Sequence, residues 1–95
     1  MNIGRAIVKV RIEKEIGQKE LAKMAGISAT SLSQIENNRK TPRPKTLTKI
    51  CEVLEIAEPL LRILSLESVD IPEHKQETFR ILGPVLEAII HQLYI

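Results

Sequence analysis

Aromatic residues are nearly absent from this chain of 95 residues, which has one Phe, one Tyr and no Trp. Its core must therefore be aliphatic. The single cysteine, Cys51, cannot form an intramolecular disulfide, which indicates a reducing compartment, and we expect it to be a small buried residue. No apolar run reaches 18 residues, which excludes a membrane-spanning helix and a membrane partner. Residues 1–5 lack the apolar segment of a signal peptide, so we expect a cytoplasmic protein.

The residue clusters that are typical of metal sites and enzyme active sites are also missing. His74 and His91 are isolated in the sequence, with no Cys or carboxylate at metal-ligand spacing. No set of nucleophile, base and orienting residue is recognisable, and there is no glycine-rich phosphate loop. The sequence therefore predicts neither an enzyme nor a bound cofactor or metal.

Charge is unevenly distributed along the chain. The net charge is +2, but residues 1–55 hold 11 Lys and Arg against 6 Glu, and residues 56–95 hold 3 against 6 Asp and Glu. The first part is thus basic and the second acidic. A basic part suits a polyanion such as nucleic acid, and an acidic part should face away from phosphate. Charge alone does not separate this interpretation from an ordinary solvated surface.

Apolar spacing and helix-ending residues divide the chain into helices, and no strand pattern is found. The sequence predicts helices over residues 3–15, 18–25, 29–37, 44–54 and 59–66, a linker over 67–74 and a helical tail over about 73–94. Proline inside a helix costs about 3 kcal/mol. We therefore expect Gly83-Pro84 to kink the tail or to divide it into two short helices. The predicted fold class is all-α.

Residues 18–37 have the pattern of two short helices joined by a tight turn. Gly26 suits the left-handed position that ends the first helix, and Ser28 is a favourable N-cap for the second. Ala22 must be small where the helices cross. The positions that hold the angle between the helices are apolar, and they are Ile27, Leu32 and Ile35.

This stretch resembles the helix-turn-helix of the phage repressor and Cro class, often called the XRE family. The resemblance covers about residues 3–66. It implies a five-helix, lambda-repressor-like DNA-binding domain over residues 1–66, then a linker and a C-terminal helical extension over residues 67–95. Gly17, Asn38 and Cys51 depart from the family, but these departures remove no DNA contact. The matching residues are Gln18, Leu21, Ala22, Ala25, Gly26, Ile27, Ser28, Leu32, Ser33, Ile35, Glu36, Asn37, Pro42, Leu47, Ile50 and Leu54.

The resemblance implies that the helix over residues 29–37 lies in the major groove of DNA. Gln34 is suited to bidentate pairing with adenine. The alternative is an exposed polar face without a DNA role. The expected base contacts are Ser28, Ala29, Thr30, Ser33 and Gln34. The expected phosphate contacts are Gln18, Asn37, Arg39, Lys40 and Arg43.

Glu36 lies inside the motif, although a carboxylate at the DNA surface would repel phosphate. The family often pairs this glutamate with an arginine of the first helix, and that arginine corresponds to Arg11. We therefore expect a partly buried Arg11–Glu36 ion pair with a structural role. The alternative is a Glu36 that accepts a hydrogen bond from cytosine.

The tail carries more apolar residues than a five-helix core requires. They would form a large exposed patch unless they pack back on the same domain or join a second copy of the chain. We favour a two-fold dimer, because reading symmetric half-sites needs two copies about 34 Å apart. The expected dimer residues are Val85, Leu86, Ile89, Ile90 and Leu93.

The predicted function is that of a sequence-specific transcriptional regulator. It would be a repressor that binds a near-palindromic operator in double-stranded DNA as a homodimer. One alternative is an antitoxin, whose tail binds a toxin protein and which also regulates its own operon. Another alternative is a controller protein of a restriction–modification operon.

Overall fold

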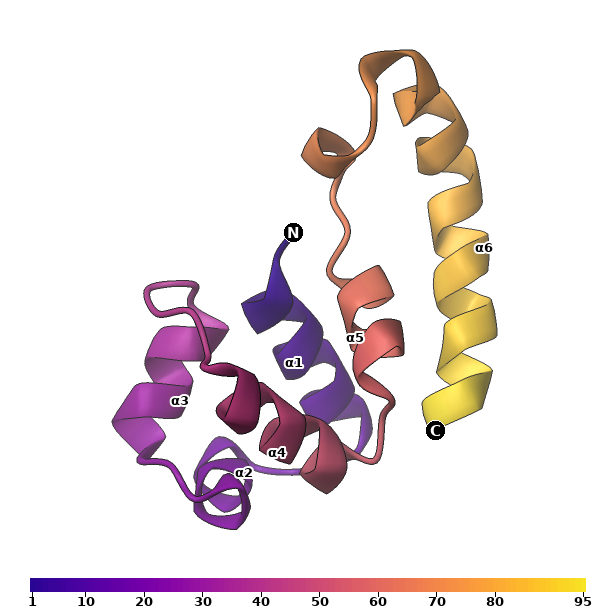
Figure 1. Ribbon diagram of the computed structural model, residues 1–95. Helices are drawn as coiled ribbons and strands as arrows, with labels where there is room; N and C mark the ends of the chain where they lie inside the picture. Colours follow the sequence, from indigo (N-terminus) through magenta and orange to yellow (C-terminus); the bar gives the residue numbers. More distant parts are fainter.

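Six α-helices and two short 3-10 turns make up the computed structural model, which describes residues 1–95 (Figure 1). The all-α prediction is confirmed. None of the helices combines the length and the apolar content needed to cross a lipid bilayer. The elements are α1 (Ile3–Glu13), α2 (Gln18–Ala25), α3 (Ala29–Glu36), α4 (Pro44–Leu54), α5 (Glu58–Leu64), η1 (Ser68–Asp70), η2 (Glu73–Lys75) and α6 (Gln76–Tyr94).

An aliphatic core lies where the first five helices, here called the five-helix unit, pack together. Each helix contributes buried residues three or four positions apart, as the helical repeat requires. Burying one such side chain contributes about 1.5–3 kcal/mol. The core also includes Cys51, where burial and then Glu58 raise the pKa of the thiol to about 11, so the thiol stays protonated. The large, fully buried aliphatic side chains are Ile7, Val10, Leu21, Leu32, Ile35, Ile50, Leu54 and Leu61.

Helix starts in the five-helix unit follow from local sequence. The Asn2 side-chain oxygen accepts a hydrogen bond from the Arg5 N–H at 2.9 Å and caps α1. The Ser28 hydroxyl accepts from the Ser31 N–H at 3.0 Å and caps α3. Pro44 is the first residue of α4, where its missing N–H costs no helical bond. These caps satisfy backbone donors that would otherwise be unpaired.

Some helix ends differ from the predictions by one or two residues. The first helix ends at Glu13 rather than at residue 15, because Glu15 has left-handed backbone with φ 57°. Gly17 is the N-cap of α2 and has extended backbone. The third helix ends at Glu36, and Asn38 after it is left-handed with φ 58°, a conformation that asparagine tolerates. The fifth helix was predicted to continue to residue 66 but ends at Leu64.

The tail forms one continuous helix, so the predicted division at Gly83-Pro84 is wrong. Pro84 lies inside α6 and is exposed to solvent. Proline removes one helical hydrogen bond, and here the carbonyl that loses its donor belongs to Arg80, which is also exposed. Water can therefore satisfy that carbonyl. The predicted linker over residues 67–74 contains η1 and the start of η2.

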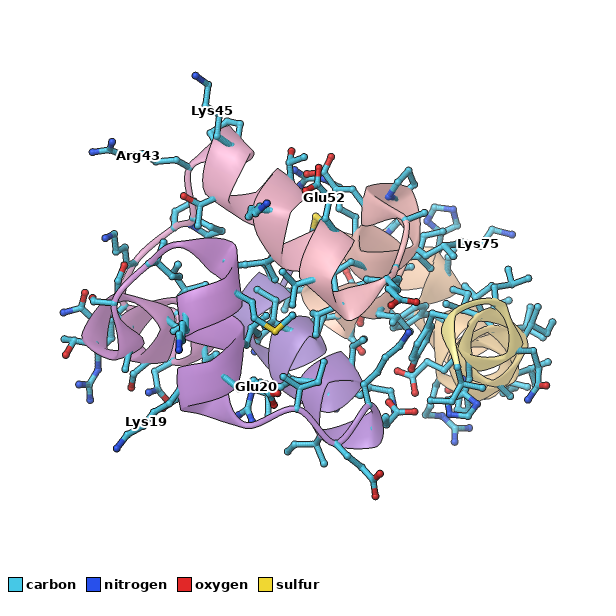
Figure 2. All side chains as sticks on the ribbon, turned by 90° about the horizontal axis from the view of Figure 1, so that it is seen from below. Lys19, Glu20, Arg43, Lys45, Glu52 and Lys75 are labelled. Carbon is cyan, nitrogen blue, oxygen red and sulfur yellow. The ribbon has the colours of Figure 1, made fainter.

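Packing of α6 on the five-helix unit is confined to the end of the helix. Its buried residues are Ile90 and Tyr94, each 3% exposed. The expectation that Ile90 belongs to a dimer surface is corrected, because this side chain lies in the core of its own chain. In both views α6 runs along the edge of the molecule opposite α3 (Figures 1 and 2).

Gly4 and Gly17 differ in the space that the fold leaves for a side chain. A Cβ on Gly4 would lie 2.6 Å from the carbonyl oxygen of Glu36, whereas one on Gly17 would meet nothing within 4 Å. Glu20 already accepts a hydrogen bond from the Gly17 N–H at 3.3 Å, but glycine has no side chain to complete the capping box.

We expect Gly17→Ser to raise the free energy of unfolding by about 0.5–1.5 kcal/mol in urea titrations, because the serine hydroxyl would cap α2.

The matched substitution Gly4→Ser should have the opposite sign. It forces backbone atoms of α1 and α3 apart and should lower the free energy of unfolding by about 1–3 kcal/mol. Equal effects of the two substitutions would contradict the close approach of these helices.

Candidate DNA-binding surface

A tight turn joins α2 to α3. Gly26 ends α2 in left-handed conformation with φ 74°, which glycine adopts without steric cost. Ile27 then packs against the core. Ala22 is 1% exposed and Leu32 is fully buried, as expected where the two helices cross. The turn leaves α3 at the outer edge of the molecule, with one long side uncovered (Figure 1).

The five expected base-contact residues fall into two groups. Thr30 and Gln34 are exposed on the outer side of α3, and Ser33 beside them is half-buried. Ala29 packs against the core and the Ser28 hydroxyl caps the helix, so both have structural roles. The uncovered side of α3 is thus short and polar, with side chains that both donate and accept hydrogen bonds.

Three of the expected phosphate contacts have partners inside the protein. The Gln18 amide donates to Glu36 Oε1 at 2.9 Å. The Asn37 amide donates to the Ser33 carbonyl at 2.9 Å. The Lys40 ammonium donates to the Ser31 hydroxyl at 2.9 Å, which leaves two of its three protons free.

Two other expected phosphate contacts are free cations. Arg39 and Arg43 are exposed and form no ion pair. Sequence reasoning missed two further exposed cations, Lys19 and Lys45, at the starts of α2 and α4. Arg43 and Lys45 project from one side of the molecule and Lys19 from the opposite side, at the end away from α6 (Figure 2). The basic excess of residues 1–55 signalled such cations but not their side.

A buried polar network lies behind this surface. Arg11 Nε donates to Glu36 Oε2 at 2.8 Å and Arg11 Nη2 donates to Oε1 at 3.1 Å. The Arg11 Nη1 group also donates to the Ile16 carbonyl at 3.2 Å. The side chains of Arg11 and Glu36 are 14% and 4% exposed. The Glu36 carboxylate of α3 thus accepts hydrogen bonds from Arg11 of α1 and from Gln18 of α2. It points into the protein and away from the uncovered side of α3.

A second uncovered surface lies on α6. Four of the five expected dimer residues, Val85, Leu86, Ile89 and Leu93, are between 39% and 65% exposed. Ile81 and Leu82, which the sequence did not single out, are 57% and 54% exposed. We call these six residues the α6 apolar face. Apolar side chains gathered on one exposed helix face are typical of an interaction surface.

Replacement of Glu36 by Leu tests the buried network. The substitution leaves the Arg11 guanidinium without its carboxylate in a poorly solvated position. We expect the free energy of unfolding to fall by about 3–5 kcal/mol, measured by urea titration with circular dichroism.

The double variant Arg11→Met, Glu36→Leu provides the control for that experiment. It removes both charges together and should recover most of the loss. A double variant no more stable than Glu36→Leu alone would show that the two side chains do not stabilise each other.

Comparison with known proteins agrees with this geometry. A family model described as helix-turn-helix matches residues 7–61. The ImmF control region 10 kDa protein of Bacillus phage phi105 is 37% identical over 68 residues, which are 72% of this chain and 76% of that protein. The HTH-type transcriptional repressor RghR of Bacillus subtilis strain 168 is 34% identical over 56 residues, 58% of this chain and 42% of RghR. The chain therefore matches less than half of RghR.

A solved structure has the same fold. The clp gene regulator ClgR from Corynebacterium glutamicum gives a TM-score of 0.69 over 90% of this chain and 92% of that chain, with 23% identity. The matched family is a helix-turn-helix family, and RghR is a transcriptional repressor of the same helix-turn-helix type. The chain belongs to the XRE-type helix-turn-helix family, and it is a transcriptional regulator with a helix-turn-helix DNA-binding domain.

Proposed function

We propose that this protein is a sequence-specific repressor that binds a near-palindromic operator as a homodimer in the cytoplasm. Residues 1–66 would bind DNA, and residues 67–95 would form the linker and the dimerisation segment. One observation carries the proposal: the uncovered side of α3 is polar and lies between exposed cations, while the Glu36 carboxylate is turned inward. The similarity to a phage control-region protein and to the transcriptional repressor RghR supports a role in repression.

The dimensions of α3 suit the major groove. An α-helix with its side chains is about 10–12 Å in diameter, and the groove is about 12 Å wide. The Gln34 amide can donate to N7 and accept from the N6 amino group of one adenine, and the Thr30 methyl can meet a thymine methyl. Ser33 lies beside them and is half-buried. Ala29 and Ser28 would make only van der Waals contacts with the bases. Ala29 packs on the core, and the Ser28 hydroxyl already caps α3.

Phosphate contacts would hold α3 in register from both sides of the groove. Lys45 and Arg43 would bind one strand and Lys19 the other, with Arg39 and Lys40 beside α3.

Gln18 would bind phosphate through its backbone N–H at the start of α2, because its side-chain amide is bound to Glu36. Asn37 would bind phosphate by exchanging the long 3.5 Å contact between its amide and the Ser33 hydroxyl for a phosphate oxygen.

Dimerisation would use the α6 apolar face. One α3 reads only a few base pairs, so operator specificity requires a second copy. The acidic part of the chain, residues 56–95, includes α6, which lies at the edge opposite α3 (Figure 1). Pairing through α6 would therefore bring acidic segments together away from the phosphates.

A toxin protein is the other occupant that the α6 apolar face would accept. Binding a toxin through this face would make the chain an antitoxin that also regulates its own operon. No feature of α6 favours a different protein over a second copy, so the homodimer is the simpler proposal. A restriction–modification controller would use the same two surfaces and differ only in the genes it regulates.

The variant Gln34→Ala tests base readout by α3. DNA fragments selected from a random pool supply the specific site, and a titration at fixed salt gives the affinity. Loss of one bidentate contact should weaken specific binding by about 5- to 150-fold, equivalent to about 1–3 kcal/mol, and leave non-specific binding unchanged. Unchanged specificity would show that Gln34 does not read bases.

Two matched controls accompany Gln34→Ala. Gln92→Ala changes an exposed glutamine of α6 and should leave DNA binding unaltered. Lys45→Ala should weaken specific and non-specific binding by the same factor and reduce the salt slope by about 1, whereas Lys75→Ala on the far side should do neither.

The full-length variant Ile89→Glu tests dimerisation. A charge in the middle of the α6 apolar face would be desolvated in the dimer, so we expect a dimer for the natural chain and a monomer for the variant in sedimentation equilibrium. Ile12→Glu on α1 is the control, because Ile12 is 60% exposed and Ile89 is 58% exposed. A natural chain that stays monomeric at all concentrations would contradict the homodimer and leave the toxin partner.

A further inference from the structure

The C-terminal end of α6 meets the five-helix unit at a single carboxylate, Glu13 of α1. Tyr94 Oη donates to Glu13 Oε1 at 2.9 Å, and His91 Nε2 lies 2.7 Å from Oε2. Lys9 Nζ lies 3.3 Å from Oε1. Both carboxylate oxygens therefore have partners, and two of the three partners belong to the same end of α6.

The aromatic rings around this carboxylate strengthen the contact. The Tyr94 and His91 rings meet edge to face with centroids 5.4 Å apart, and Lys14 Nζ lies 5.9 Å from the Tyr94 ring centroid. Burial and the Glu13 carboxylate raise the pKa of Tyr94, so its hydroxyl remains a donor. Together with the buried Ile90, these residues make a specific joint, here called the Glu13 joint.

The remainder of α6 is attached differently. Near its start, the Gln76 amide donates to the carbonyls of Ser68 and Ile71 at 3.0 Å and 3.1 Å. The amino terminus of Met1 pairs with Asp70 in the same segment at 2.8 Å. Between this segment and the Glu13 joint, an open hollow of about 560 Å³ separates the middle of α6 from the five-helix unit. Arg5, Leu66, Phe79 and Gly83 are among its lining residues.

A helix tethered at its first turn by a short linker can pivot, and a second attachment at the far end removes that freedom. The direction of α6 relative to α3 therefore depends on the Glu13 joint. In a dimer formed through the α6 apolar face, that direction determines the distance and angle between the two α3 helices. We infer that Glu13 is a positioning residue that sets which half-site spacing the dimer accepts. This inference rests on the proposed homodimer.

Operators with altered spacing test the inference on the full-length chain. Each added base pair moves a half-site by about 3.4 Å and turns it by about 34°. We expect the natural dimer to lose at least about tenfold in affinity when the spacing changes by two base pairs. The variants Glu13→Ala and Tyr94→Phe should lose less than about threefold, with unchanged affinity for a single half-site.

The variant Tyr94→Phe keeps the buried ring and removes one donor, so it carries the test if Glu13→Ala does not fold. Glu52→Ala is the matched control, because Glu52 lies on α4 with its side chain 62% exposed and its loss changes the charge equally. This control should retain the natural spacing preference.

Two results would overturn the inference in different ways. Variants of Glu13 and Tyr94 that dimerise and keep the natural preference would show that the joint does not set the spacing, while the homodimer proposal stands. A natural chain that is monomeric, or that binds one half-site and two half-sites equally well, would overturn the homodimer and the inference with it.

Discussion

The buried Glu36 carboxylate joins the first three helices, because it belongs to α3 and accepts hydrogen bonds from Arg11 of α1 and Gln18 of α2. Its side chain is 4% exposed, so these donors take the place of the water that the carboxylate loses on burial. A buried ion pair adds little net stability compared with apolar packing, but it accepts one geometry far better than others. Here that geometry is the orientation of α3 relative to α1 and α2.

A second contact between α1 and α3 lies near the start of the chain. The Gly4 N–H donates to the Asn38 side-chain oxygen at 3.3 Å, directly after α3, and the Asn38 amide donates to Asn2 at 2.5 Å. The helix α1 thus holds α3 through Arg11 and again through this asparagine cluster. A helix fixed at two places presents its side chains to DNA without a large loss of conformational entropy on binding.

Much of the five-helix unit was predictable, because local sequence decides it. Gly26, Ser28 and the spacing of Leu32 and Ile35 are sufficient for the α2–turn–α3 unit, and the predicted fold class was confirmed. The left-handed conformation of Glu15 was not predictable, since this conformation is unusual for glutamate and is imposed by the path of the chain into α2. Four of the six helices have a boundary that differs from its prediction by one to three residues.

The surfaces were less predictable than the core. Whether a cation is free depends on tertiary neighbours, so the sequence missed Lys19 and Lys45. It also gave no sign that the Gln18 amide is bound within the chain. Ile90 and Ile89 are equivalent in type and adjacent in sequence, yet one is 3% and the other 58% exposed. Only the docking of α6 at Glu13 decides which of them is buried.

Replacement of operator purines by their 7-deaza analogues tests most directly whether α3 reads the major groove. The analogue lacks the N7 acceptor of that groove, while the minor-groove edge and the backbone charge are unchanged. We expect affinity to fall by about 5- to 150-fold at the purines that α3 contacts. Unchanged affinity with every purine replaced, together with a loss when inosine replaces guanine and removes its minor-groove amino group, would contradict readout by α3.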